Sequence, residues 1–231
     1  MATHLDLEEQ EQLDQLKHFW KQYGNLITWV LILALGGFAA FNGWHWYQRD
    51  RAGRAGVLFD ELDRAAQTGD ADRATRVFSD MREHYPSTAY AEQAGLLAAK
   101  VQFEKGKLDA ARESLQWVAA NAVEPEYQLL ARVRLAGVLT DQKQYDEALK
   151  QLPADAPKPF EALVADRRGD ILLAQGKKDE AKAAYQQAYQ AMGPEVEYRR
   201  LIEAKLTSLG AAPAPEAAAS AASAPAAGAS Q

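Results

Sequence analysis

Hydrophobic and polar positions divide the chain into one long apolar stretch near the N-terminus and a series of amphipathic segments after it. Residues 22–48 carry no formal charge and have an apolar centre between Leu26 and Phe41. Beyond them, apolar residues recur with the spacing of a helix face, and no convincing run of alternating β-branched residues is found. Alanine and other good helix formers dominate the composition. The pattern predicts an all-α protein.

The apolar stretch is long enough to cross a membrane, because about 20 apolar residues in a helix span a hydrocarbon core about 30 Å thick. Aromatic residues of the kind found at membrane interfaces flank it: Trp20, Tyr23, Trp44, Trp46 and Tyr47. A cleaved signal peptide would be shorter and would start with basic residues, whereas the acidic string DLEEQEQLD precedes this stretch. We therefore predict an uncleaved signal anchor, a transmembrane helix over 23–47, after a short N-terminal segment, 1–22.

Four segments beyond the anchor share one repeat frame. Their turn positions, Gly69, Gly106, Lys143 and Gly176, are 37, 37 and 33 residues apart. Glycine there allows the left-handed conformation that ends a helix. Five residues after each turn position comes an alanine small enough to let two helices approach closely: Ala74, Ala111, Ala148 and Ala181. A period near 34 residues is typical of tetratricopeptide repeats, so we expect an α-solenoid of about four helical hairpins over 48–210.

The last part of the chain is expected to hold a capping helix and a tail. An amphipathic segment opens with Pro194, and its apolar face is predicted to cover the last hairpin. The residues of that face are Tyr198, Leu201, Ile202, Leu206 and Leu209. Residues 211–231 are rich in Ala, Pro and Ser and contain no large apolar residue. We expect this tail to be disordered, because it cannot bury enough surface to offset the entropy of ordering.

Composition and charge narrow the possible functions. The net charge of −6 argues against nucleic acid as a partner. The absence of cysteine excludes disulfides and thiol catalysis, and the four histidines show no metal-ligand spacing. No nucleophile–base pair or phosphate loop is found. We therefore expect no cofactor, no metal and no catalytic residues, and hence a protein that is not an enzyme.

The tripeptide Arg168-Gly169-Asp170 resembles a cell-adhesion signal, which acts at the tip of an exposed loop. In the repeat frame, however, Gly169 takes the small position of a first helix. A glycine inside a helix costs about 1 kcal/mol relative to alanine, so close packing of the paired helix is the expected reason for it. Asp166 and Asp170, one helical turn apart, resemble an acid–base dyad, but Arg167 on the same face favours an ordinary charge pair.

Two stretches resemble the YfgM family of bacterial inner-membrane proteins, ancillary subunits of the Sec translocon. They are EQLDQLKHFWKQYG, running into the span, and VADRRGDILLAQGKKDEAKAAY, with Asp166, Arg168, Gly169 and Asp170. The resemblance implies a cytoplasmic N-terminus, one span and a periplasmic repeat domain. It also implies partners, namely SecYEG, a PpiD-type periplasmic chaperone and unfolded or nascent secreted polypeptides, and a role in passing secreted proteins to periplasmic chaperones.

Partners of such a solenoid bind the concave surface formed by the first helices of the hairpins. Transferred along the repeat frame, the expected groove residues are Phe59, Leu96, Leu97, Phe103, Leu130, Val133, Arg134, Asp166, Arg167, Asp170 and Leu173. This mixed apolar and charged set suits transient contact with extended chains.

Two alternatives to the translocon role stay open. One is an envelope scaffold for another machine, such as cell division or outer-membrane assembly. The other is a cytoplasm-facing adaptor, because two cations precede the span closely, Lys17 and Lys21, and three follow it, Arg49, Arg51 and Arg54. Cations favour the cytoplasmic side, so this count opposes the orientation that the resemblance implies.

Overall fold

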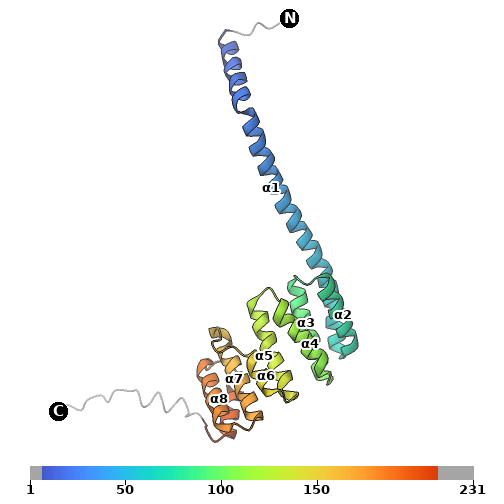
Figure 1. Ribbon diagram of the computed structural model, residues 1–231, viewed down its shortest axis with the longest axis vertical. Coiled ribbons are helices and arrows are strands. Elements are labelled where there is room, and N and C mark those ends of the chain that lie inside the picture. The colour runs from blue at the N-terminus through green and yellow to red at the C-terminus, as the bar shows by residue number, and fades with distance from the viewer. Residues whose placement is uncertain (1–6, 213–231) are drawn as a thin grey trace, which may run out of the picture. The chain divides into compact units, whose positions relative to one another are not determined.

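A computed structural model describes residues 7–212 of the chain, and their side chains from residue 13 onward (Figure 1). Within that range there are nine α-helices and no strand. The all-α prediction is confirmed. The predicted tail lies almost entirely in 213–231, outside the described residues. The chain divides into two compact units, Met1–Arg54 and Ala55–Gln231, which are described separately.

The first unit consists of most of α1, a helix that runs without interruption from Leu7 to Thr68. By length and composition, α1 is suited to crossing a membrane. Its apolar side chains are exposed, with exposed fractions of 71% for Leu33 and 69% for Phe38. The polar groups of this segment bond to the helix itself, since Thr28 donates to the Gly24 carbonyl at 2.7 Å and Asn42 to the Phe38 carbonyl at 2.9 Å. Such bonds reduce the cost of placing polar groups in lipid.

The second unit is built from helical hairpins. The end of α1 pairs with α2 (Ala71–His84), α3 (Ala89–Glu104) with α4 (Leu108–Asn121), α5 (Pro125–Asp141) with α6 (Tyr145–Gln151), and α7 (Lys158–Ala174) with α8 (Lys178–Ala191). The helix α9 (Tyr198–Ser208) then packs on α8. The prediction of four hairpins and a capping helix is confirmed, and Figure 1 shows α2 to α8 following one another along the array.

The turns inside the hairpins adopt the backbone conformation that the repeat frame predicts. The φ angles of Gly69, Gly106, Lys143 and Gly176 are +66°, +72°, +61° and +80°. Lys143 is the one residue with a side chain among these four, and among the described residues it is the single non-glycine with positive φ. The left-handed conformation at all four turns is thus confirmed, and at Lys143 it costs about 1 kcal/mol more than at a glycine.

Three hydrophobic clusters form the interior of the array. The first lies between the end of α1, α2 and α3, and includes Leu62, Phe78 and Met81. The second joins α3 to α7 and includes Leu115, Leu139 and Ile171. The third lies between α7, α8 and α9. Each hairpin therefore shares its core with the next, as in other repeat proteins.

The third hairpin departs from the regular pattern, because α6 has only seven residues. It ends at Gln151, and Pro153 follows two residues later, where a helix cannot continue. The side chain of Arg168 holds the connection that results, donating from Nη2 to the Pro153 carbonyl at 2.7 Å. The Arg168-Gly169-Asp170 tripeptide thus lies inside α7, as predicted, and its arginine supports a neighbouring loop.

Candidate functional site

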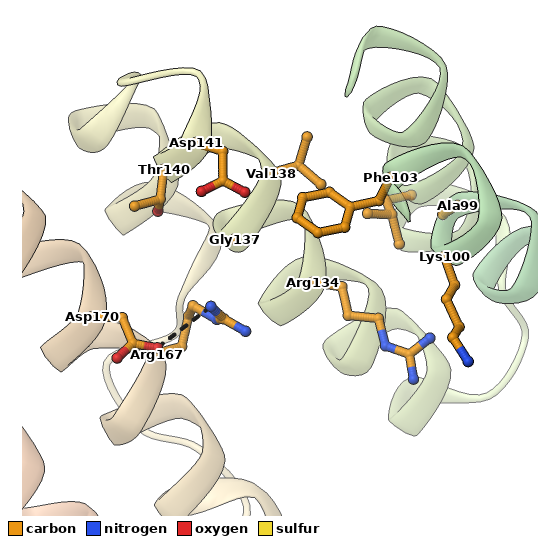
Figure 2. A pocket seen from close by; sticks show the side chains of 11 residues that line it. Ala99, Lys100, Phe103, Arg134, Gly137, Val138, Thr140, Asp141, Arg167 and Asp170 are labelled. Atoms are coloured by element: carbon orange, nitrogen blue, oxygen red, sulfur yellow. Dashed lines mark hydrogen bonds and ion pairs between the residues drawn. The ribbon is translucent and has the colours of Figure 1, made fainter. Parts of the chain in front are cut away.

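A pocket of about 340 Å³ opens between the first helices of the last three hairpins. We call it the α3–α5–α7 pocket (Figure 2). Its lining residues are Ala99, Lys100 and Phe103 of α3, Leu115 of α4, Arg134, Gly137, Val138, Thr140 and Asp141 of α5, and Arg167 and Asp170 of α7. First helices are the elements on which the repeat frame places partner contacts. The pocket is therefore the candidate functional site.

Apolar side chains form one part of this pocket. Leu115 and Val138 are buried members of the central core, so they form a fixed surface. Phe103, by contrast, is 42% exposed even though it is a large aromatic residue. Figure 2 shows its ring beside Val138 and between the side chains of α3 and α5. An exposed aromatic ring within a pocket gives a ligand a large apolar contact.

Three cations lie around this apolar part: Lys100, Arg134 and Arg167. Arg134 donates from Nη1 to the Leu96 carbonyl at 3.5 Å, a long bond, and desolvation lowers the pKa of its guanidinium. Arg167 lies against α5, where Gly137 leaves room for it: a Cβ at that position would stand 3.2 Å from Arg167 Nη1. Figure 2 shows the charged ends of Lys100 and Arg134 on the same side of the pocket.

The acidic residue of α7 in this pocket, Asp170, already has several partners. Its Oδ2 atom lies 3.5 Å from Arg167 Nη1. Its Oδ1 atom accepts hydrogen bonds from Lys205 Nζ at 2.7 Å and from the Tyr185 hydroxyl at 2.8 Å. The predicted Arg167–Asp170 pair is present, but Lys205 of α9 and Tyr185 of α8 approach the carboxylate more closely. Asp170 thus belongs to two groups of residues at once.

The second group, which we call the α9 clamp, consists of Asp166, Asp170, Tyr185, Tyr198 and Lys205. Asp166 is only 2% exposed, and it accepts from Lys205 Nζ at 2.7 Å and from the Tyr198 hydroxyl at 2.8 Å. Burial, followed by the hydrogen bond to Asp170, raises the pKa of Tyr185. Burial, followed by the hydrogen bond to Asp166, raises the pKa of Tyr198. The α9 clamp ties the capping helix to the last hairpin.

The structure separates the eleven predicted groove residues into three classes. Four line the pocket: Phe103, Arg134, Arg167 and Asp170. Four are partly buried against the hydrophobic clusters: Phe59, Leu97, Leu130 and Leu173. Three are buried rather than on an open surface: Leu96, Val133 and Asp166, with exposed fractions of 6%, 2% and 2%. Neighbouring hairpins cover Leu96 and Val133, and α9 reaches Asp166, which corrects their assignment to the groove surface.

The predicted packing positions lie at helix contacts. Ala74, Ala111, Ala148 and Ala181 are all 0% exposed. Gly169 is buried as well, and a Cβ placed there would stand 2.5 Å from Cε1 of Tyr185. A side chain at residue 169 therefore has no space, because α7 and α8 approach closely at this point.

Sequence reasoning did not identify Lys100, Gly137, Tyr185, Tyr198 or Lys205 as members of a site. Tyr198 was assigned to the apolar face of the capping helix, but the residue is 40% exposed and its hydroxyl donates to Asp166. One signal was present: Tyr198 and Lys205, seven residues apart, share a helix face, as Asp166 and Asp170 do at a spacing of four. Of the predicted capping face, Ile202 and Leu206 are buried.

The side chains of the candidate site are suited to non-covalent contacts. Among the described residues, no group of three His, Asp or Glu side chains is arranged to hold a metal ion. The pocket instead combines an aromatic ring, guanidinium groups and an ammonium group on three helices of one rigid array. Such a site fits an extended ligand with apolar and negatively charged groups.

Comparison with known proteins gives consistent matches over most of the chain. The model of a family described as tetratricopeptide repeat-like domain matches residues 17–211. A Neisseria gonorrhoeae protein named ancillary SecYEG translocon subunit is 36% identical over 213 residues, which are 90% of this chain and 100% of the relative. Proteins with the same name from Haemophilus influenzae and Escherichia coli are 29% and 28% identical, over 88% and 77% of this chain and 98% and 85% of their own lengths. The region matched by the family model includes α1 from residue 17 onward and α2 to α9.

Proposed function

The chain belongs to the YfgM family of ancillary SecYEG translocon subunits, and from this premise we propose that it is a membrane-anchored, non-enzymatic subunit associated with the Sec translocon. The observation that carries the proposal is the combination, in one chain, of a helix able to cross a membrane and a repeat array with a binding pocket. The name shared by the relatives supports the Sec translocon as the complex with which the protein associates.

The finer part of the proposal concerns topology and partners. We infer a cytoplasmic segment over 1–22, a span over 23–47 and a periplasmic repeat domain over 48–210. In that arrangement the repeat domain meets secreted polypeptides as they leave the channel, and it passes them on together with a PpiD-type chaperone. The mixed apolar and cationic pocket supports such transient contact, because it offers side-chain contacts without enclosing the ligand.

Crosslinking from the span tests the association with the channel. A photo-crosslinking amino acid is placed at Leu33 or Phe38, which are both largely exposed along α1. Irradiation of intact cells is expected to capture a subunit of the SecYEG channel. The matched control is the same amino acid at Arg76, an exposed position on the second helix of a hairpin, where no channel capture is expected.

The outcomes separate the proposal from its alternatives. Capture of a division or outer-membrane assembly component in place of the channel would make the protein a scaffold of that machine. Protease added to spheroplasts tests the topology, and cleavage in the repeat domain supports a periplasmic location. A repeat domain cut only after the membrane is permeabilised would identify a cytoplasm-facing adaptor instead.

A further inference from the structure

We propose that the α3–α5–α7 pocket binds an extended acidic segment of a partner polypeptide. In this proposal, carboxylate side chains of the segment bind Arg134 and Arg167, and its apolar side chains contact Phe103. The inference rests on the proposed function, in which the repeat domain binds partner polypeptides, and specifies the chemistry of the segment that is bound. It concerns an internal segment of the partner rather than its C-terminus.

The first argument is that two guanidinium groups in the pocket have unused hydrogen-bonding capacity. A guanidinium has five N–H donors. Among the described side chains, Arg134 has no carboxylate partner, and the hydrogen bond it makes is the 3.5 Å contact with a backbone carbonyl. The Nη2 atom of Arg167 makes no hydrogen bond to the described residues, and the contact of its Nη1 atom with Asp170 is 3.5 Å long. Carboxylates are the strongest natural partners of such groups.

The second argument concerns the charge that an incoming anion would meet. Lys205 lies 2.7 Å from both Asp166 and Asp170 and balances the charge of one of these carboxylates, while Arg167 balances the other. Lys100 lies 3.9 Å from Glu104, a distance that leaves its ammonium group available. Figure 2 shows Asp141 on the side of the pocket away from the guanidinium of Arg134. Lys100 and Arg134 therefore make one part of the pocket locally positive, and Arg167 adds hydrogen-bond donors beside them.

The third argument is geometric and favours an internal segment. Packed helices lie 8–10 Å apart, so α3 to α7, two helix steps, span roughly 20 Å. An extended chain covers about 3.3 Å per residue, and roughly six residues therefore cross the pocket. The cations come from all three helices, with Phe103 among them. A lone terminal carboxylate would engage one of the two guanidinium groups and leave the other unused.

The overall charge of the protein sets the character of the interaction. With a net charge of −6, the molecule as a whole does not attract anions from a distance. Attraction arises only within the pocket, at short range, and competes with salt. The expected complex is consequently weak and transient, as a protein that handles a series of clients requires.

Fluorescence anisotropy with the full chain in detergent tests the proposal. The probe is a fluorescein-labelled, C-terminally amidated octapeptide in which glutamate alternates with leucine and phenylalanine. One comparison peptide has glutamine in place of glutamate, and another is the glutamine peptide with a free C-terminal carboxylate. The protein variants are Arg134→Gln and Phe103→Ser, and the matched control is Arg132→Gln, an exposed arginine of α5 outside the pocket.

The acidic peptide is expected to bind more tightly than both glutamine peptides, with Kd rising as salt is added. Arg134→Gln should raise its Kd about tenfold, the usual scale of a lost charge-assisted hydrogen bond. Phe103→Ser should raise it about fivefold through the lost aromatic contact. Arg132→Gln should leave it unchanged, and the circular dichroism melting curves of all variants should match the wild type.

Three results would overturn the inference. These are equal binding of the glutamate and glutamine peptides, equal effects of Arg134→Gln and Arg132→Gln, and tight binding that requires only the free C-terminal carboxylate. None of them depends on the translocon, because the peptide assay contains no channel. Loss of channel crosslinking in the wild type would defeat the proposed function and leave the peptide result standing, so the two failures are distinguishable.

Discussion

The α3–α5–α7 pocket and the α9 clamp are neighbours on α7. Both contain charged side chains, but these side chains have different surroundings in the two groups. In the pocket, Arg134 has a 3.5 Å bond to a carbonyl and faces open space. In the α9 clamp, Asp166 is almost fully buried and accepts bonds of 2.7 and 2.8 Å from the capping helix. Arg134 and Asp166 are both charged side chains on first helices of the array, α5 and α7. What differs is whether another helix covers them.

This difference shows what decides the role of a charged residue in a repeat array. A residue at a given register of a first helix is free to bind a partner only if the array leaves it uncovered. Where a capping helix packs over that position, the residue there makes contacts inside the protein and contributes to its stability. Asp170, which belongs to both groups, marks the boundary between the two uses.

The largest expected effect comes from removing the cation of the α9 clamp. Lys205→Met leaves the carboxylates of Asp166 and Asp170 without their ammonium partner, and the Asp166 side chain is only 3% exposed. Breaking a buried ion pair in this way should lower the free energy of unfolding by about 2–3 kcal/mol. Urea denaturation followed by circular dichroism measures the change.

The matched control for that substitution is Arg134→Met in the pocket. It removes a cation of similar length at an exposed position of α5 that has no carboxylate partner among the described residues, and should change the free energy of unfolding by less than about 0.5 kcal/mol. Equal losses for the two variants would show that burial by α9 does not separate the α9 clamp from the pocket.

A smaller effect is expected at the close contact beneath the α9 clamp. Gly169→Leu places a side chain where a Cβ alone would stand 2.5 Å from the ring of Tyr185. Overpacking lowers the free energy of unfolding by about 1–3 kcal/mol. Replacing a glycine inside a helix raises it by about 1 kcal/mol, because other residues have a higher helix propensity. Because Tyr185 is itself only 1% exposed and its ring has little room to move, the upper end of the overpacking cost applies, and the net destabilisation should be about 2 kcal/mol, seen as a lower Tm. Ala174→Leu, at an exposed position of the same helix, is the control, and an unchanged Tm for the Gly169 variant would refute the packing argument.

The smallest expected effect is a loss of stability at alkaline pH. The pKa values of Tyr185 and Tyr198 are raised by burial and by their carboxylate partners, so the folded protein holds these two protons more tightly than the unfolded chain does. Their contribution to stability is therefore complete below the unfolded tyrosine pKa of about 10 and is lost as the pH rises above it.

Urea midpoints measured between pH 8 and pH 11 follow this loss. Tyr198→Phe removes one of the two titrating groups that face Asp166, Asp170, Arg167 and Lys205, so its midpoint should fall less steeply above pH 10 than that of the wild type. Identical slopes for the two proteins would show that Tyr198 does not hold its proton through the α9 clamp.

Much of the fold was predictable, because the repeat frame is a local signal. The turns at Gly69, Gly106 and Gly176 follow from the need for positive φ, and their spacing even located a lysine, Lys143, in the same conformation. The buried alanines follow from the same frame. A signal that recurs every 33 to 37 residues requires no knowledge of tertiary contacts.

The candidate site was predictable only in part, since the repeat frame does not say which neighbour covers a residue. Phe103 and Arg134 were placed correctly on first helices, but so were Leu96 and Val133, which the adjacent hairpins bury. The α9 clamp was missed because Lys205 lies 35 residues from Asp170 and 39 from Asp166 along the chain. The short length of α6 was not predicted, because it depends on Pro153, which occurs in one hairpin and is not part of the repeat frame.

The capping helix also limits how far the array extends. A bare last hairpin would present an apolar face matched in shape to the next repeat, and copies of the protein would then add head to tail without closing into a ring. Ile202 and Leu206 occupy that face from within the same chain, and Lys205 secures them through its bonds to α7. The α9 clamp thus keeps covered an apolar face on which a second copy of the protein could otherwise stack.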